Sequence, residues 1–239
     1  MILRIIMLII MNFPTMFWAD NLETDEKFQL KATLRYITDA TYIWVQSDQI
    51  VDQTALERSA DVFALQTYPI VHEAFGTEWL PGVDGDPRLY ILHATGLGSG
   101  VAAYFASDSS HPTAAVPSSN GHEMFFVNLD AMGDSIGTPY YDGVLAHEFQ
   151  HMVHWNNDRN EDSWLDEGMA ELASLLTGFD RQGFASYYLR QPATQLTTWP
   201  EIESTAPHYG ASFMFATYFH ERFGDVGTRQ LVTRNTWRT

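Results

Sequence analysis

Two histidines and a glutamate lie close together in the segment His147-Glu-Phe-Gln-His151. Residues at positions i and i+4 of an α-helix share one face, so both imidazoles can reach a single ion. Glu148 lies beside them, close enough to hydrogen-bond a water molecule on that ion. The pattern therefore predicts a metal site with His147 and His151 as ligands. The alternative is a core helix that carries two histidines by chance.

A second segment, Trp164-Leu-Asp-Glu-Gly-Met-Ala-Glu171, supplies what this site lacks. A catalytic zinc ion usually has three protein ligands and a water, and Glu167 follows on the next predicted helix, begun by Ser163. Glu171 is one turn further on the same face, where it can accept the free N–H of a ligating histidine. Because both glutamates sit among apolar residues, they are not expected to be ordinary solvated helix charges.

His154 leaves a second ligand set open, because it shares the helix face of His147 and His151. A pair of His151 and His154 could chelate the ion instead, but Glu148 would then have no role. The longer metzincin pattern is excluded, since His154 stands at its glycine position and Asn157 at its third histidine position.

The charge of the chain excludes several other functions. The 239 residues hold 30 Asp and Glu against 13 Lys and Arg, a net charge of −17. Nucleic-acid binding needs clustered Lys and Arg residues, so a nucleic-acid partner is not expected. Binding to anionic lipid is disfavoured because the chain is strongly negative. There is no cysteine, which rules out disulfides, iron–sulfur clusters and thiol catalysis. Imidazole and carboxylate groups must therefore hold any metal.

Residue patterns predict strands first and helices afterwards, which indicates an α+β fold. A hairpin is expected at residues 32–38 and 42–45, followed by a helix from Asp52 or Thr54 to Phe75 that Pro69 bends or ends. Further strands are expected at 88–93, 101–105 and 123–129. Helices are expected at 140–156, 163–177, 180–190 and 207–223, and the tail from Asp225 also favours helix.

The N-terminal residues 1–19 are largely apolar, with Arg4 near the start and a small residue, Ala19, at the junction with an acidic segment. This composition favours a secretory signal and a secreted or cell-surface protein. The bulky Phe17 and Trp18 make a poor cleavage site, so a lipid-embedded anchor or a misassigned start are alternatives. The stretch is shorter than the roughly 18 to 20 apolar residues of a spanning helix, so no stable membrane insertion is expected beyond this segment.

Asp84 and Asp86 raise the question of calcium, since they lie in the Gly- and Pro-rich segment 81–87. The full loop of alternating oxygen ligands that ends in a glutamate is missing, so calcium binding is unsupported and a turn is predicted instead.

The motifs at 147–151 and 164–171 together resemble the gluzincin metallopeptidases, and most closely the secreted bacterial enzymes of the hyicolysin type. The specific match covers about residues 140–178, with weaker similarity to 223. The resemblance implies that His147, His151 and Glu167 bind one catalytic Zn²⁺ and that Glu148 is the general base. Glu171 would accept a hydrogen bond from the ring nitrogen of a ligating histidine that does not bind the metal.

The same resemblance implies a zincin-like fold and a domain organisation. Residues 20–157 would form a mixed twisted sheet with the zinc-binding helix, and residues 158–239 a helical part that is truncated or incomplete. An edge strand, expected at 101–105, would line the cleft above the active-site helix.

Gluzincins also supply a tyrosine or histidine that donates to the oxyanion of the tetrahedral intermediate. His208 and Tyr209 open an apolar helix that resembles the segment where zinc aminopeptidases place their tyrosine, although the glycine spacing differs. Tyr209 is the preferred donor and His208 the second candidate.

The predicted function is zinc-dependent hydrolysis of protein or peptide substrates, by an endopeptidase. Zinc aminopeptidases carry a glutamate for the substrate amine in a G-x-M-E-N stretch. Here Glu123 lies in Gly121-His-Glu-Met, where the order differs and the asparagine is absent. A zinc aminopeptidase, a zinc hydrolase of non-peptide substrates and a truncated, inactive zincin-like binding domain are the alternatives.

Overall fold

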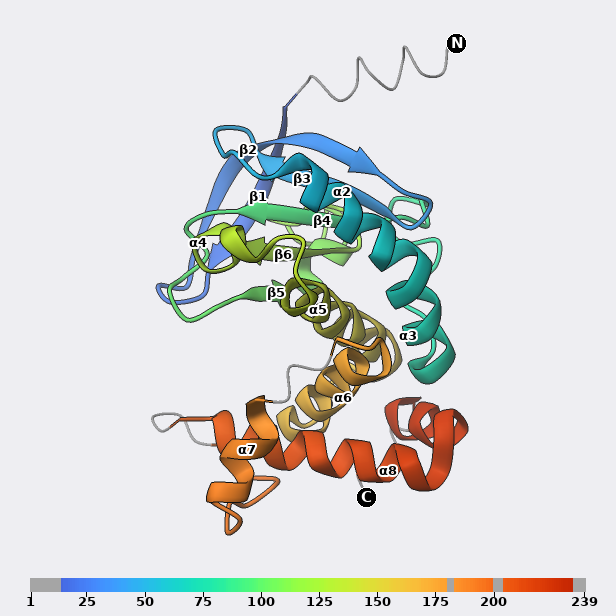
Figure 1. The fold of residues 1–239 in the computed structure, drawn as a ribbon. Coiled ribbons are helices and arrows are strands. Elements are labelled where there is room, and N and C mark those ends of the chain that lie inside the picture. Colours follow the sequence, from blue (N-terminus) through green and yellow to red (C-terminus); the bar gives the residue numbers. More distant parts are fainter. Residues whose placement is uncertain (1–13, 180–182, 200–203, 234–239) are drawn as a thin grey trace. The chain divides into compact units, whose positions relative to one another are not determined.

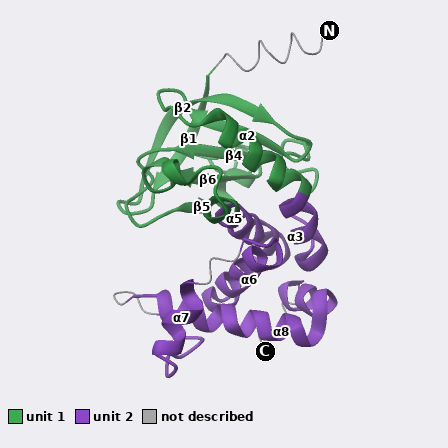
Figure 2. Cartoon of the chain, in the orientation of Figure 1, with its two compact units in different colours: residues 1–65, 79–142 green, residues 66–78, 143–239 purple. Residues whose placement is uncertain are grey.

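A computed structural model describes residues 14–179, 183–199 and 204–233 and confirms an α+β fold. The chain divides into two units, drawn in different colours in Figure 2. One comprises residues 1–65 and 79–142, and the other comprises 66–78 and 143–239. Helix α5 (Pro139–Asn157) thus runs from the first unit into the second, whereas the sequence predicted a boundary after residue 157.

The first unit is built on one six-stranded mixed sheet with the strand order β1-β2-β3-β4-β6-β5 (Figure 1). Strands β3, β4 and β6 are parallel neighbours, and the other pairs are antiparallel. The predicted edge strand at 101–105 is confirmed as β5. The strands are β1 (Thr15–Asn21), β2 (Glu26–Ile37), β3 (Thr41–Gln46), β4 (Leu89–Ala94), β5 (Ala103–Phe105) and β6 (Met124–Asn128).

The hairpin of β2 and β3 forms where the sequence predicted it. The Thr38 hydroxyl accepts hydrogen bonds from the backbone N–H groups of Ala40 and Thr41, which closes the turn. Along β2, Leu30, Ala32 and Leu34 are buried while the residues between them are more exposed. This alternation places one face of the strand in the core.

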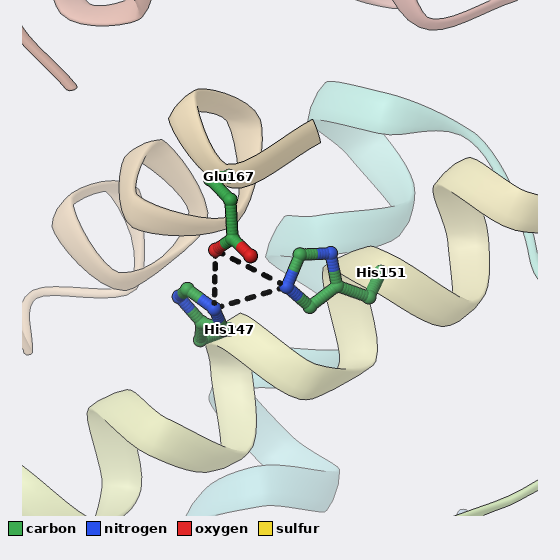
Figure 3. Close-up of side chains that lie close together, drawn as sticks. All are labelled: His147, His151 and Glu167. Carbon is green, nitrogen blue, oxygen red and sulfur yellow. Dashed lines mark hydrogen bonds and ion pairs between the residues drawn. The ribbon is translucent and has the colours of Figure 1, made fainter. Parts of the chain in front are cut away.

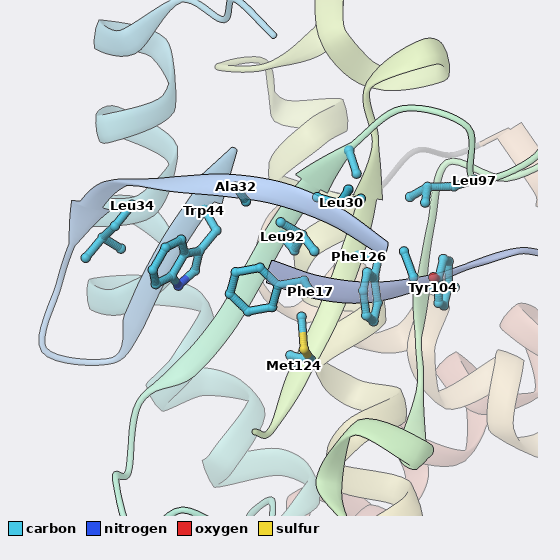
Figure 4. Packing of buried hydrophobic residues seen from close by; sticks show 12 residues of the cluster. Phe17, Leu30, Ala32, Leu34, Trp44, Leu92, Leu97, Tyr104, Met124 and Phe126 are labelled. Carbon is cyan, nitrogen blue, oxygen red and sulfur yellow. The ribbon is translucent and has the colours of Figure 1, made fainter. Parts of the chain in front are cut away.

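The sheet curls, so that its two edges approach each other. The Asp20 N–H of β1 donates to the Tyr104 hydroxyl of β5 at 2.8 Å. The enclosed core contains Phe17, Trp44, Leu92 and Phe126 from four different strands (Figure 4). Burial of these side chains is the main force that holds the curled sheet together.

Strand β1 includes the end of the predicted N-terminal segment. Residues 1–13 lie outside the described residues, but Thr15–Asn21 pair with β2 over their whole length. Phe17 and Ala19 are each only 2% exposed. The end of the predicted segment, residues 15–19, therefore belongs to the sheet. Apolar residues in a short run suit a buried strand as well as a signal, which is why the sequence pattern did not separate them.

The helix predicted from Asp52 to Phe75 forms in three pieces. Helix α2 (Gln53–Val62) begins with Asp52 accepting the Ala55 N–H, a π-helical turn covers Phe63–Thr67, and α3 (Tyr68–Phe75) follows. Pro69 lies in the first turn of α3, where its missing N–H costs no hydrogen bond.

The segment 81–87 is a turn region, as predicted. Asp84 accepts the Asp86 N–H and pairs with His122, and Asp86 pairs with Arg88. The two carboxylates are thus used within the turn and by neighbouring side chains.

The described part of the second unit is helical. None of the described helices has the length and apolar character needed to cross a membrane. Of the predicted helix at 180–190, residues 180–182 lie outside the described residues; α8 continues past 223 and includes a kink at Gly224. Besides α3, the helices are the second part of α5 (Pro139–Asn157), α6 (Ser163–Leu176), α7 (Gly183–Arg190) and α8 (Ala206–Thr233).

Candidate metal centre

Helix α5 carries the first motif, and its start follows from its sequence. The Thr138 hydroxyl accepts the Tyr141 N–H, and Pro139 is the first helical residue, where its fixed φ suits a helix. Leu145, Phe149 and Met152 are at most 1% exposed, as predicted for the face that backs the helix. Burial of these apolar residues fixes the rotation of α5 and hence the direction in which its histidines point.

Helix α6 lies antiparallel to α5 in the second unit. The Ser174 hydroxyl donates to the Gly143 carbonyl at 2.8 Å, near the start of one helix and the end of the other. Further along, His151 lies near Glu167. Because the contacts run in opposite directions along the two helices, both motifs face each other along one seam.

Three potential ligand atoms converge on that seam (Figure 3). The Nε2 atoms of His147 and His151 are 3.0 Å apart, and Oε2 of Glu167 lies 3.2 Å from the first and 3.6 Å from the second. A tetrahedral ion with bonds of about 2.0 to 2.1 Å separates its ligand atoms by about 3.3 to 3.4 Å. The observed spacing therefore fits one zinc ion.

The outer nitrogens of both rings face carboxylates. Nδ1 of His147 lies 3.2 Å from Oε1 of Glu171, and Nδ1 of His151 lies 3.1 Å from Oδ1 of Asp166. Carboxylates there favour a proton on Nδ1, which leaves the Nε2 lone pairs directed at the same point. Among the described residues, Oε2 of Glu167 is buried without a hydrogen bond. Two lone pairs and a buried carboxylate oxygen that face one another suit a cation.

The close contacts between histidines and carboxylates also set the pKa values of the cluster. Burial lowers the pKa of His147, but the nearby carboxylates of Glu167 and Glu171 outweigh it and raise the pKa to about 9. Burial raises the pKa of Glu167, but the nearby rings of His151 and His147 hold it well below its ordinary value. The carboxylates therefore attract positive charge to this point, whether as protons or as a metal ion.

Glu148 and Tyr209 lie at the same centre. Glu148 follows His147 on α5 and is 6% exposed. The Tyr209 hydroxyl, at the start of α8, lies close enough to Glu167 for this carboxylate to affect its pKa. Burial raises the pKa of Tyr209 well above its ordinary value, and the charges of Glu167, Glu171 and Glu148 raise it further. Tyr209 thus stays protonated and can act as a donor.

Close helix packing positions Tyr209. Gly168, next to Glu167, faces α8 so closely that an added Cβ would lie 2.9 Å from the Ser212 carbonyl oxygen. The Tyr209 ring also lies between Phe184 and Trp199, with ring centroids 4.8 Å away in each case. These contacts bring the hydroxyl of Tyr209 to Glu167.

His208, the second candidate donor, has different surroundings. Its ring lies 5.9 Å from that of Trp199, and its buried Nδ1 has no hydrogen-bond partner among the described residues. Among the described residues, His208 makes this ring contact with Trp199 and none with Glu167 or Glu171. Neighbouring positions on a helix point about 100° apart, so only one of the two can face the seam.

Asp166 and His154 lie beside the cluster in an arrangement that the sequence did not predict. Of the predicted alternative pair, His151 belongs to the converging group, whereas His154 is not part of that group in the described residues. Nδ1 of His154 instead lies 3.1 Å from Oδ1 of Asp166, the same oxygen that faces His151. The position of Asp166 directly before Glu167 was the available signal.

Glu123, the residue considered for an aminopeptidase site, ends a loop before β6. Its carboxylate accepts the Val83 N–H and packs against Gly82, and the side chain is 4% exposed. These contacts agree with a structural role at the strand end.

The α+β fold and the convergence of two histidines and a glutamate from two helices define a zincin-like arrangement. No protein-family model matches the chain. Over 234 residues the chain is 28% identical to the neutral metalloprotease ShpI of Staphylococcus hyicus. The matched region covers 87% of this chain and 51% of that protein. The chain thus spans about half the length of this relative. The similarity confirms the resemblance to bacterial metallopeptidases that the two motifs predicted.

Proposed function

We propose that this protein is a zinc metallopeptidase that cleaves protein or peptide substrates internally. The observation that carries the proposal is the meeting of His147 Nε2, His151 Nε2 and Glu167 Oε2 at one point. The similarity to a neutral metalloprotease supports it.

Zinc bound to these three residues would supply Lewis-acid polarisation of a water molecule and of the peptide carbonyl. Glu148 would accept a proton from the attacking water and deliver it to the leaving amine. Tyr209 would donate its hydroxyl proton in a hydrogen bond to the oxyanion, and it is preferred over His208 because its hydroxyl lies at Glu167. Glu171 would keep the proton of His147 on Nδ1.

The first test measures zinc per chain and cleavage of labelled casein. We expect about one zinc ion in the wild type, strongly reduced in Glu167→Ala, and cleavage that a chelator abolishes. Glu148→Gln should retain zinc and lose cleavage, whereas Glu221→Gln, at an exposed position of α8, should retain both. Zinc without cleavage would favour the truncated, inactive binding domain, and a folded chain without zinc would exclude the metal centre.

A second assay separates the kinds of hydrolase. A peptide with an acetylated N-terminus has no free amine, so an endopeptidase cleaves it and an aminopeptidase does not. Cleavage of simple esters but no peptide would identify a hydrolase of another substrate class. The structural contacts of Glu123 favour the endopeptidase.

We further propose that the protein is exported, on the basis of the apolar composition of residues 1–19. Because Phe17 and Ala19 are buried in β1, a cleavage that leaves the sheet intact lies before Thr15. N-terminal sequencing of the protein from the culture medium tests this position.

A further inference from the structure

One carboxylate oxygen lies between two histidines of α5. Oδ1 of Asp166 is 3.1 Å from Nδ1 of His151 and 3.1 Å from Nδ1 of His154. A carboxylate oxygen can accept two hydrogen bonds, so each imidazole can donate to it. His151 is one of the three converging residues, whereas His154 is one turn further along the same helix face and outside that group.

His154 is held on its other side as well. It is 1% exposed, and its Nε2 lies 3.7 Å from Oε2 of Glu161 in the loop between α5 and α6. Nε2 of Gln150 lies 3.5 Å from its Nδ1. Nε2 of His154 makes no hydrogen bond among the described residues, so burial and the carboxylates on either side limit how far the ring can turn.

Asp166 has no such burial of its own. Its side chain is 36% exposed, in the first turn of α6, where a free carboxylate can rotate toward water. The contact with Nδ1 of His154, 3.1 Å away, restricts that rotation and keeps Oδ1 in front of His151. The order of contacts is then Glu161, His154, Asp166, His151, and it ends at the Nε2 atom that faces Glu167.

We propose that His154 is a positioning residue of the metal centre, which acts through Asp166 to orient the imidazole of His151. The inference rests on the proposed zinc function. It explains why a fully buried histidine that is no ligand lies on the ligand face of α5. Packing alone would not require its Nδ1 to face the same oxygen as Nδ1 of His151.

Two substitutions that keep a polar side chain distinguish the contact of His154 with Asp166 from its contact with Glu161. In His154→Asn the amide nitrogen occupies nearly the place of Nδ1, so the contact with Asp166 is kept and that with Glu161 is lost. In His154→Gln the longer amide takes the place of Nε2, so the contact with Asp166 is lost. Ser174→Ala is the control, because it removes a buried hydrogen bond between α5 and α6 without touching the histidines.

The readouts are zinc affinity, by competition with a chelating dye, and the visible absorption spectrum of the cobalt(II)-substituted protein, which reports ligand orientation. Loss of an outer partner of a metal ligand typically costs about 10-fold to 100-fold in affinity. We expect this loss and a changed cobalt spectrum for His154→Gln. His154→Asn and Ser174→Ala should stay close to the wild type in both.

A double-mutant cycle tests the route through Asp166. In an Asp166→Ala background, His154→Gln should cause no further loss of affinity, because the residue it acts through is gone. Equal affinity for wild type and His154→Gln, or an additive loss in the double variant, would overturn the inference while leaving the metal centre intact. A folded wild type that binds neither zinc nor cobalt would overturn the proposed function and this inference together.

Discussion

His147 and Glu171 face each other across antiparallel helices, with Nδ1 of the histidine 3.2 Å from Oε1 of the glutamate. Because Glu171 is 4% exposed, this carboxylate is held in place by the protein rather than by water. It favours the tautomer that leaves Nε2 of His147 free to bind a metal. Under the proposed function, the metal centre depends on Glu171 although this residue is not among the three converging groups.

Glu171→Ala should therefore weaken zinc binding by about 10-fold to 100-fold, since the partner of Nδ1 is lost. Glu171→Gln should lose less, because its amide oxygen can still accept from Nδ1. Competition with a chelating dye measures both affinities. Equal zinc affinity in wild type and Glu171→Ala would contradict the proposed role.

Tyr209→Phe should lower kcat by about 100-fold to 1000-fold, the usual effect of removing one oxyanion donor. Zinc content should not change, because the hydroxyl is not among the three converging ligand atoms. Steady-state kinetics on a blocked peptide measure the effect. His208→Ala is the comparison, and a larger loss there than in Tyr209→Phe would assign the donor to His208.

The stability of the first unit should depend on pH through His93. This residue is fully buried; its Nδ1–H donates to the Trp44 carbonyl, and its Nε2 accepts the Tyr141 hydroxyl. Burial lowers the pKa of His93 to about 4, although the hydrogen bond to Trp44 acts in the opposite direction. The neutral ring therefore stabilises the folded protein above the unfolded pKa of about 6.5.

As the pH falls from 6.5 toward 4, the unfolded chain takes up this proton first, and the free energy of unfolding should drop by about 3 kcal/mol. Urea unfolding at several pH values, with chelator present, measures the drop. In His93→Gln the corresponding drop should be smaller. A parallel pH profile for wild type and variant would show that His93 does not cause it.

Gly168→Ala should destabilise the helical unit by about 1 to 3 kcal/mol, because the new Cβ would crowd the Ser212 carbonyl of α8. It should also reduce kcat, because α8 carries Tyr209. Thermal unfolding and peptide kinetics test the two effects. Gly183→Ala, at a site with open space around the Cβ, serves as control and should have little effect on kcat.

Local sequence determined much of the fold and the core of the site. The residue pattern predicted a helix at 163–177 that Ser163 begins, and the structure has α6 at Ser163–Leu176. The i and i+4 spacing of His147 and His151 alone places both rings on one face. The strand β1 was not predicted, because its apolar run is also typical of a signal segment.

Only the tertiary structure decided which distant residues meet. The sequence left Tyr209 and His208 as neighbouring candidates, and the packing of Gly168 against α8 brings Tyr209 to Glu167. It also left His154 as an alternative ligand, whereas the antiparallel pairing of α5 and α6 turns its Nδ1 to Asp166. Periodicity fixes the face of a single helix, but the register between two helices depends on side chains packed across their seam. For that reason His147, His151, Glu167 and the outer partner Glu171 could be predicted from the chain alone, whereas the contacts of Asp166 with His151 and His154 could not.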